Sequence, residues 1–201
     1  MGNLLKLPEH LYPSDFDIYL FHEGTLFESY KLLGAHIFSE NGLQGVRFAV
    51  WAPHAKEVSV VGIFNNWNGS QNKMERIEHS GIWVLFVPEL THGDIYKYEV
   101  TGPDGHKELK ADPYAFYTEL RPATASVVYK LDNYEWHDQK WIAQRVKKDI
   151  YHKPMKIYEV HLASWKQKKD GEFYSYQELA EELVDYAVEN GFTHIELMPV
   201  M

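Results

Sequence analysis

Two glutamates come first among the residues that could do chemistry. Glu159 and Glu196 each lie in a short, mostly apolar segment that reads as a strand of a parallel sheet. Carboxyl groups brought together at the rim of such a sheet can serve as an acid and a base. Each of these glutamates lies mid-strand among apolar residues, where a carboxyl group is usually paired or neutralised. We therefore expect a structural role for both.

Metal and phosphate chemistry are not indicated. The eleven histidines include no HExxH pattern and no pair that a third ligand would complete, so we expect no metal site. Segment 102–107, GPDGHK, has the glycines of a phosphate-binding loop, but it lacks the full spacing and no helix follows it. We interpret it as a hairpin turn, and we expect no cofactor.

Trp67 is the strongest candidate for ligand contact. It lies in the polar turn FNNWNG, residues 64–69, which is an awkward place for a core residue. Indole faces stack on the apolar faces of sugar rings, and an amide such as that of Asn66 can bond hydroxyl groups. Sugar contact and packing against another domain both remain open for Trp67. Three other tryptophans are assigned mainly to packing, namely Trp51, Trp83 and Trp165. Trp83 is also kept as a candidate for sugar contact.

The composition narrows the classes of function. The chain has 201 residues, 20 Lys and Arg against 29 Asp and Glu, and a net charge of −9, which disfavours nucleic acid as a partner. It contains no cysteine, which fits a reducing compartment, and we expect a cytoplasmic protein. No apolar run approaches the roughly 18 residues of a membrane span, and the first residues lack the features of a secretory signal, so we expect no membrane partner.

Short β-strands must position the tryptophan turn. Residues 34–130 alternate short runs of β-branched and aromatic residues with turn clusters, which predicts a β-sandwich. Seven strands are expected near 34–38, 46–52, 57–63, 82–87, 95–101, 107–110 and 126–130. In strand 46–52 the period of two places Val46, Phe48 and Val50 on a core face and Arg47, Ala49 and Trp51 on the other. Before the strands, residues 14–24 have the layout of a short helix with a capping box, Ser14 with Asp17, and a glycine stop.

The last quarter of the chain changes period. Segment 156–161 predicts a strand, 176–189 an amphipathic helix, and 193–200 a second strand. Ser175 and Glu178 form a capping box before the helix, whose apolar face holds Leu179, Ala180, Leu183, Val184, Tyr186 and Ala187. The two strands should be parallel, and parallel sheets are almost always covered on both faces. We therefore expect 156–201 to open a larger domain.

Several long motifs carry a resemblance to a known family. They are GVRFAVWAPHA at 45–55, VSVVGIFNNWNG at 58–69, KADPYAF at 110–116, RPATASVV at 121–128, IYEVHLASW at 157–165 and GFTHIELMPVM at 191–201. Together they resemble the N-terminal part of bacterial 1,4-α-glucan (glycogen) branching enzymes.

The resemblance implies a fold and a division into domains. It implies a mostly β chain in which an immunoglobulin-like β-sandwich, a carbohydrate-binding module of family 48, precedes an incomplete βαβ start of a (β/α)8 barrel. The implied domains are a lead-in at 1–29, the module at 30–130, a connector at 131–155 and the barrel start at 156–201.

The resemblance also implies an activity for the parent enzyme. Branching enzymes cut α-1,4-linked chains and transfer them to a 6-hydroxyl by a retaining mechanism. Their catalytic Asp, Glu and Asp belong to motifs that do not occur in this chain, so we expect no catalytic residue and no activity from the 201 residues alone. The implied partners are α-glucans, such as glycogen and maltooligosaccharides, and the missing catalytic barrel.

Related family-48 modules that bind glycogen imply two contacts here. The residues that match their binding positions are Trp67 and Lys97. Those modules carry a second tryptophan where this chain has His106, so we expect only weak glucan binding.

Two other functions compete with this hypothesis. One is a stand-alone glycogen-binding or regulatory module, which would have no use for the strands in 156–201. The other is debranching or trehalose-releasing hydrolysis, as in relatives that share the sandwich, but the motifs at 110–116, 121–128 and 157–165 fit branching enzymes better.

Overall fold

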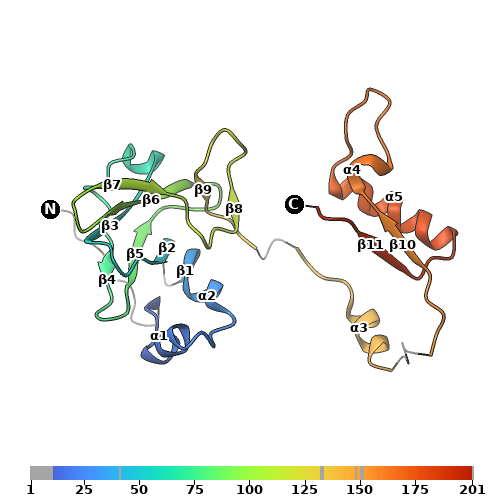
Figure 1. Cartoon of the computed structure of the whole chain (residues 1–201), viewed down its shortest axis with the longest axis horizontal. Helices are drawn as coiled ribbons and strands as arrows, with labels where there is room; N and C mark the ends of the chain where they lie inside the picture. The colour runs from blue at the N-terminus through green and yellow to red at the C-terminus, as the bar shows by residue number, and fades with distance from the viewer. Residues whose placement is uncertain (1–10, 41, 132–133, 148, 150–151, 201) are drawn as a thin grey trace. The chain divides into compact units, whose positions relative to one another are not determined.

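The chain folds into two compact units in a computed structural model (Figure 1). The structure describes residues 11–40, 42–131, 134–147, 149 and 152–200. Residues 1–10 of the expected lead-in, and Met201, lie outside the described residues. One unit comprises Met1–Glu135 and the other Trp136–Met201, and each is described by itself.

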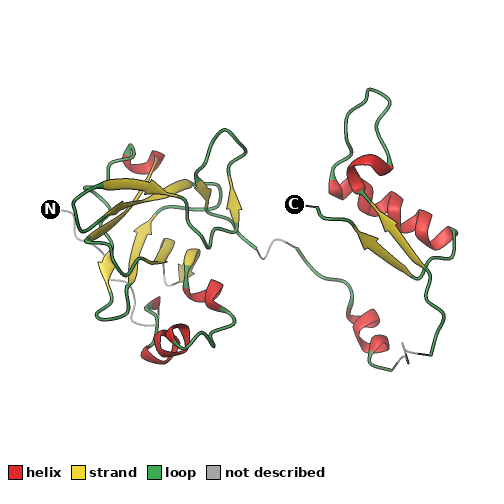
Figure 2. Ribbon diagram, in the orientation of Figure 1, coloured by secondary structure: helices red, strands yellow, loops and turns green. Residues whose placement is uncertain are grey.

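Two antiparallel sheets build the first unit (Figure 2). The first sheet has the strand order β1 (Gly34–Glu40), β2 (Leu43–Trp51), β5 (Ile82–Pro88) and β4 (Glu75–Arg76). The second has the order β3 (Glu57–Gly62), β6 (Ile95–Thr101), β9 (Ser126–Val127) and β8 (Tyr117–Thr118), with β7 (Lys107–Lys110) paired to β6. All seven expected strands form, the last of them shortened to two residues.

A shared core joins the two sheets into a β-sandwich. Alternate residues of β2 and β5 pack in one apolar cluster with alternate residues of β3 and β6. Fully buried members of this cluster are Val46, Phe48, Val58, Val60, Tyr96, Tyr98 and Val128. The period of two therefore predicted the core face of the strands correctly.

The outer face of the first sheet is also buried. Two helices, α1 (Asp15–His22) and α2 (Ser29–Leu32), belong to a second apolar cluster with Ala49 and alternate residues of β5. Arg47 is buried there, and its guanidinium donates to the carbonyl groups of Leu32 at 2.9 Å and Lys31 at 3.0 Å. Of the three residues predicted on this face, Trp51 alone remains half exposed, with its ring 5.9 Å from that of Phe21.

The lead-in helix begins and ends as its residues predict. Ser14 and Asp17 form the capping box of α1, which satisfies amide groups at the helix start. The helix ends at His22, and Gly24 follows with a φ of +72°, a conformation that glycine adopts without strain. This helix is more than a lead-in, because its inner side packs on the sandwich.

The second unit contains a strand, a helix and a second parallel strand. Its elements are α3 (Gln139–Arg145), β10 (Ile157–Val160), α4 (Leu162–Trp165), α5 (Tyr176–Glu189) and β11 (His194–Leu197). β10 pairs with β11 in parallel, with Tyr158 opposite Ile195, which confirms the predicted orientation. The predicted capping box of Ser175 and Glu178 is present at the start of α5.

Only part of the predicted apolar face of α5 is buried. Leu179, Leu183 and Ala187 are buried, and the two leucines pack with Val160 and Leu162. Ala180, Val184 and Tyr186, predicted on the same face, are exposed. Because the sheet has only two strands within the described residues, it is too narrow to cover the whole face of the helix.

Candidate functional site

The buried side-chain amide of Asn65 holds the start of the turn that carries Trp67. After β3, the short 3-10 helix η2 (Ile63–Asn65) ends in Asn65, whose side chain is buried. Its Nδ2 donates to the Val60 carbonyl at 2.9 Å and its Oδ1 accepts from the Gly62 amide at 3.0 Å. Buried polar groups hold their geometry when every bond is made. The first asparagine of FNNWNG is therefore structural.

The two residues that follow have an uncommon backbone conformation. Asn66 has a φ of 54° and Trp67 a φ of 57°, the left-handed region that a bulky residue rarely adopts. The Trp67 amide donates to the Gly62 carbonyl at 2.8 Å, which closes the turn. The residue as a whole remains 37% exposed. Backbone strain of this kind is concentrated at active sites, ligand clamps and switch regions, which makes this turn a candidate for ligand contact.

Lys97 lies beside this turn through the strand register. It is opposite Val61 in the pairing of β3 with β6, one residue from the Gly62 carbonyl that holds Trp67. Its Nζ donates to Thr124 Oγ1 at 2.7 Å, so the ammonium group is held on the outer face of the second sheet. The structure thus brings the Trp67 turn and Lys97 to adjoining positions.

Glu99 is a further polar residue at this place that the sequence did not indicate. A Cβ added to Gly69 would lie 2.3 Å from its carboxylate, so the Trp67 turn passes directly over Glu99. Lys107 donates to the same carboxylate at 2.7 Å. The period of two along β6 could have found Glu99, because it places residues 97 and 99 on one face.

Trp83 has a different position. Its side chain is only 6% exposed, and its Nε1 donates to the Ala52 carbonyl at 2.9 Å. The indole packs in the sandwich core, with the Arg76 guanidinium 5.7 Å from the ring centre. Trp83 therefore has a packing role in this structure.

His106 lies in the turn between β6 and β7. Its amide donates to Asp104 Oδ1 at 3.0 Å, and its exposed Nε2 lies 3.5 Å from Glu108. Segment 102–107 is therefore a hairpin turn, as its residues predict.

The two glutamates of the second unit are neighbours. Glu159 and Glu196 lie directly opposite each other in the register of β10 and β11, and both side chains are exposed. In the described chain both carboxylates are therefore exposed rather than enclosed by apolar residues as expected, and their structural role stays a prediction. The reason is that they point away from α5, whose leucines cover only the other face of the strand pair.

The described residues contain no group of three or more His, Cys, Asp or Glu side chains arranged to hold a metal ion. They also contain no helix with the length and apolar character needed to cross a membrane.

Comparison with known proteins indicates a class for the first unit. Residues 32–115 match carbohydrate-binding module 48, the isoamylase N-terminal domain. The matched range contains the Trp67 turn and Lys97, together with most of the sandwich.

Curated relatives match nearly the whole chain. The 1,4-alpha-glucan branching enzyme GlgB of Geobacillus stearothermophilus is 55% identical over 189 residues, which cover 94% of this chain and 30% of the relative. The enzyme of the same name from Bacillus subtilis is 52% identical over 188 residues, with the same coverage. The chain thus corresponds to the N-terminal part of these relatives and spans less than a third of their length.

Solved structures share the fold. A Klebsiella pneumoniae pullulanase complexed with maltotriose matches with a TM-score of 0.59 at 25% identity, covering 84% of this chain and 18% of that one. A putative alpha amylase from Salmonella typhimurium matches with a TM-score of 0.56 at 23% identity, covering 84% of this chain and 24% of that one.

Proposed function

We propose that this chain is the N-terminal portion of a 1,4-α-glucan branching enzyme, and that its first unit binds α-glucan. The observation that carries the proposal is 55% identity to such an enzyme over 94% of the chain. The parent protein would cut α-1,4-linked chains and transfer them to 6-hydroxyl groups, which is the retaining two-carboxylate chemistry of glycosidases with a sugar as acceptor. The cysteine-free composition favours a reducing compartment, so the proposal places the protein in the cytoplasm.

The proposed division of labour follows the domains expected from the sequence. Residues 30–130 would be the immunoglobulin-like glucan-binding module, with 1–29 as the lead-in, and 131–155 would connect it to a (β/α)8 barrel that opens at 156–201. Support for the barrel comes from β10 and β11, which are parallel and have one face without a covering layer in the described chain. Exposed apolar residues near this pair and on α5 include Ile157, Val184, Leu197 and Met198. Parallel sheets bury both faces, so further strands and helices would cover them.

The proposed glucan surface consists of Trp67, Asn66 and Lys97. The half-exposed indole offers a stacking face for a glucose ring, while the Asn66 amide and the Lys97 ammonium group offer donors to hydroxyls. One stacking contact is worth about 1–3 kcal/mol by analogy with aromatic platforms. Association itself costs several kcal/mol, so binding should be weak.

An NMR titration of the isotope-labelled 201-residue chain with maltoheptaose tests this surface. We expect amide shifts at residues 62–70 with a dissociation constant on the order of 0.1–10 mM. Trp67→Ala should weaken binding at these amides several-fold, and Lys97→Met should weaken it less. Trp141→Ala, which removes an exposed tryptophan of the second unit, is the matched control and should change nothing. Unchanged affinity in a folded Trp67→Ala protein would remove this surface from the proposal.

A chimaera tests the proposed activity. The chain would replace its counterpart in the Bacillus subtilis relative, of which it matches 30%. Branching of amylose by the chimaera, followed as a shift of the iodine spectrum, supports the enzyme assignment. A folded chimaera that leaves amylose unbranched would favour the competing function, a stand-alone glycogen-binding module.

A further inference from the structure

A second concave surface lies at the open edge of the sandwich. It is a cleft of about 730 Å³ lined by residues of the edge strand β1, the turn after β5, and the segments around Phe116 and Tyr129. Ligand pockets typically have about 300–1,000 Å³. None of the residues of the Trp67 turn, nor Lys97, lines this cleft.

Aromatic rings form much of the cleft wall. Tyr129 is stacked against Tyr117, with ring centres 5.2 Å apart and planes 19° apart, and it meets His92 edge-on at 5.0 Å. On the β1 side, His36 meets Phe116 edge-on at 5.5 Å. Each ring is held by another ring, so the wall is preorganised, which lowers the cost of binding a flat apolar face.

The polar groups of the cleft suit hydroxyl groups. Ser39, Gln44 and Thr91 bring hydroxyl and amide side chains to it. His92 Nδ1 accepts from the Lys130 amide at 3.2 Å, so its Nε2 carries the ring proton and can donate. β1 pairs with β2 alone among the described strands, and an edge strand has backbone donors and acceptors along its outer side.

Charge does not dominate the cleft. Lys31 is held by Glu28 at 2.7 Å, and Lys130 and Glu89 add one charge of each sign to the lining. Such a balance does not favour a phosphorylated or otherwise anionic ligand. Rings combined with neutral hydrogen-bonding groups favour a neutral ligand that has both apolar faces and many hydroxyls.

We infer that this cleft is a second α-glucan-binding site, which takes a short run of glucose units of a linear chain. The inference takes its ligand class from the proposed function but uses a surface separate from Trp67. Two sites on one unit would hold a long chain, or two chains of one glycogen particle, more tightly than either site alone. A peptide strand added along β1 is the competing occupant, but nothing in the wall of stacked rings requires one.

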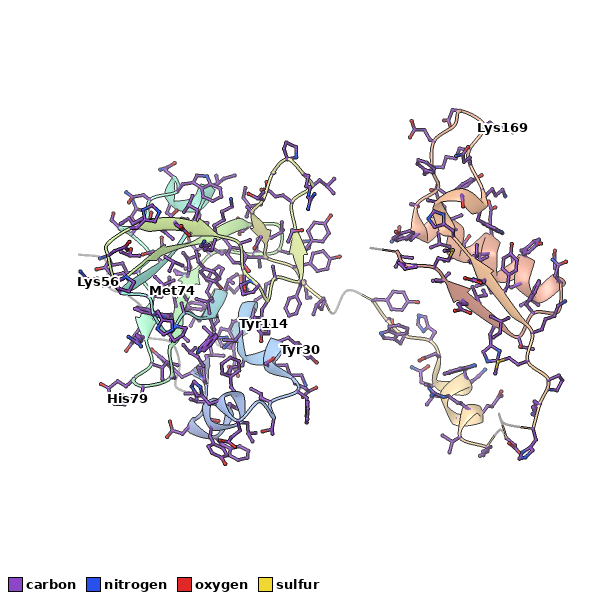
Figure 3. The ribbon with its side chains drawn as sticks, in the orientation of Figure 1. Tyr30, Lys56, Met74, His79, Tyr114 and Lys169 are labelled. Carbon is purple, nitrogen blue, oxygen red and sulfur yellow. The ribbon has the colours of Figure 1, made fainter. Side chains whose placement is uncertain are left out.

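The absence of cysteine allows a clean test. Thr91→Cys places a single thiol in the cleft. Modification of this thiol with a bulky maleimide should block the cleft. Lys56→Cys with the same label is the matched control. Figure 3 shows Lys56 and the cleft residue Tyr30 on opposite sides of the first unit. Each maleimide-labelled protein is folded if, without sugar, the amide chemical shifts of β2 and β5 equal those of the wild type.

Maltoheptaose is the probe, and its binding to the cleft is followed by the NMR shifts of the Ser39 and Gln44 backbone amides. We expect these two amide signals to shift on sugar addition in the wild-type chain and in Trp67→Ala. In the Thr91→Cys protein labelled with maleimide, we expect binding at the cleft to be at least tenfold weaker. The Lys56→Cys label should leave the affinity unchanged. Shifts confined to residues 62–70 would overturn the second site and leave the proposed function standing. Cleft shifts that persist despite the label, or vanish in Trp67→Ala, would also overturn it. No shift anywhere at tens of millimolar sugar would remove both surfaces.

Discussion

The hydroxyl group of Tyr96 donates a 2.6 Å hydrogen bond to the Asp112 carboxylate inside the first unit. Tyr98 donates to the same carboxylate oxygen at 3.1 Å, and the Tyr114 amide donates to the other oxygen at 2.8 Å. The Asp112 amide in turn donates to Ser126 Oγ at 2.8 Å. One buried side chain thus joins β6 to the segment after β7, and its backbone joins that segment to β9.

Removal of this carboxylate should destabilise the sandwich strongly. Asp112→Ala removes the acceptor of the buried Tyr96 hydroxyl and leaves Tyr98 only the more distant Ala49 carbonyl, at 3.5 Å. We expect the free energy of unfolding to fall by about 2–4 kcal/mol. Urea unfolding measures this change. Glu78→Ala, in an exposed turn, is the control and should stay within about 0.5 kcal/mol. A loss below about 1 kcal/mol in Asp112→Ala would show that the hydroxyls find other partners.

The same carboxyl group should give a pH dependence. Burial raises the pKa of Asp112 above its usual value, although hydrogen bonds from Tyr96, the Tyr114 amide and Tyr98 oppose the shift. The native state therefore binds the proton more tightly than the unfolded chain. This contribution to stability is fully present below the unfolded pKa and is lost as pH rises through the folded pKa.

Asp112→Asn isolates that contribution, because the amide does not titrate. We expect the wild type to lose stability relative to Asp112→Asn between pH 3.5 and pH 7, as measured by the urea midpoints of the two proteins at each pH. A constant difference over this range would contradict a raised pKa.

His36 should make the first unit sensitive to acid in the opposite sense. Burial, followed by the nearby Arg47 charge, lowers the pKa of this imidazole, while the bond to the Leu33 carbonyl at 2.9 Å opposes the shift. The unfolded chain then binds more protons near and below pH 6.5, so stability is full above that pH and falls as pH decreases. We expect His36→Gln to reduce the loss between pH 7.5 and pH 5.5. His79→Gln, in an exposed turn, should retain it.

Local signals in the sequence predicted the elements, while distant packing decided their faces. Both capping boxes and the parallel strand pair followed from residues close together in the chain. The burial of Arg47 and Ala49 did not, because helices some twenty residues earlier supply the cover. β4 and β8 were not predicted, because each has only two residues and the alternation of apolar and polar residues cannot be recognised over so short a run. Likewise, the polar turn predicted an exposed Trp67, but a cleft assembled from residues between 30 and 131 has no local pattern.

The 201-residue chain alone should show no branching activity. The catalytic carboxylate motifs of branching enzymes do not occur in it, and a retaining transfer needs both a nucleophile and an acid. Amylose incubated with the purified chain should keep its iodine spectrum unchanged. The full-length 1,4-alpha-glucan branching enzyme GlgB of Geobacillus stearothermophilus is the positive control. A sustained blue-to-red shift in proportion to the chain's concentration would mean that carboxylates within these residues do the chemistry.

The two units should differ in stability when the chain is studied alone. The first unit buries both faces of β2 and β5, between the second sheet on one side and α1 and α2 on the other. Among its described residues, the second unit buries one face of a two-stranded sheet against α5, and the apolar cluster there has four buried members. Opening of a segment with so few buried contacts costs little free energy.

Hydrogen exchange measures this difference residue by residue. We expect slow amides in β2, β5 and β6 and fast amides in β10, α5 and β11, so that residues 30–130 remain folded when the tail beyond about 150 opens. Equal protection in both units would mean that something covers the open face of the strand pair, most simply a second copy of the chain. Sedimentation of the same sample shows whether the chain is a dimer, with a second copy covering the strand pair, or a monomer. A monomer with slow exchange in β11 would show that the second unit is stable by itself, and the inference that it needs further strands would fail.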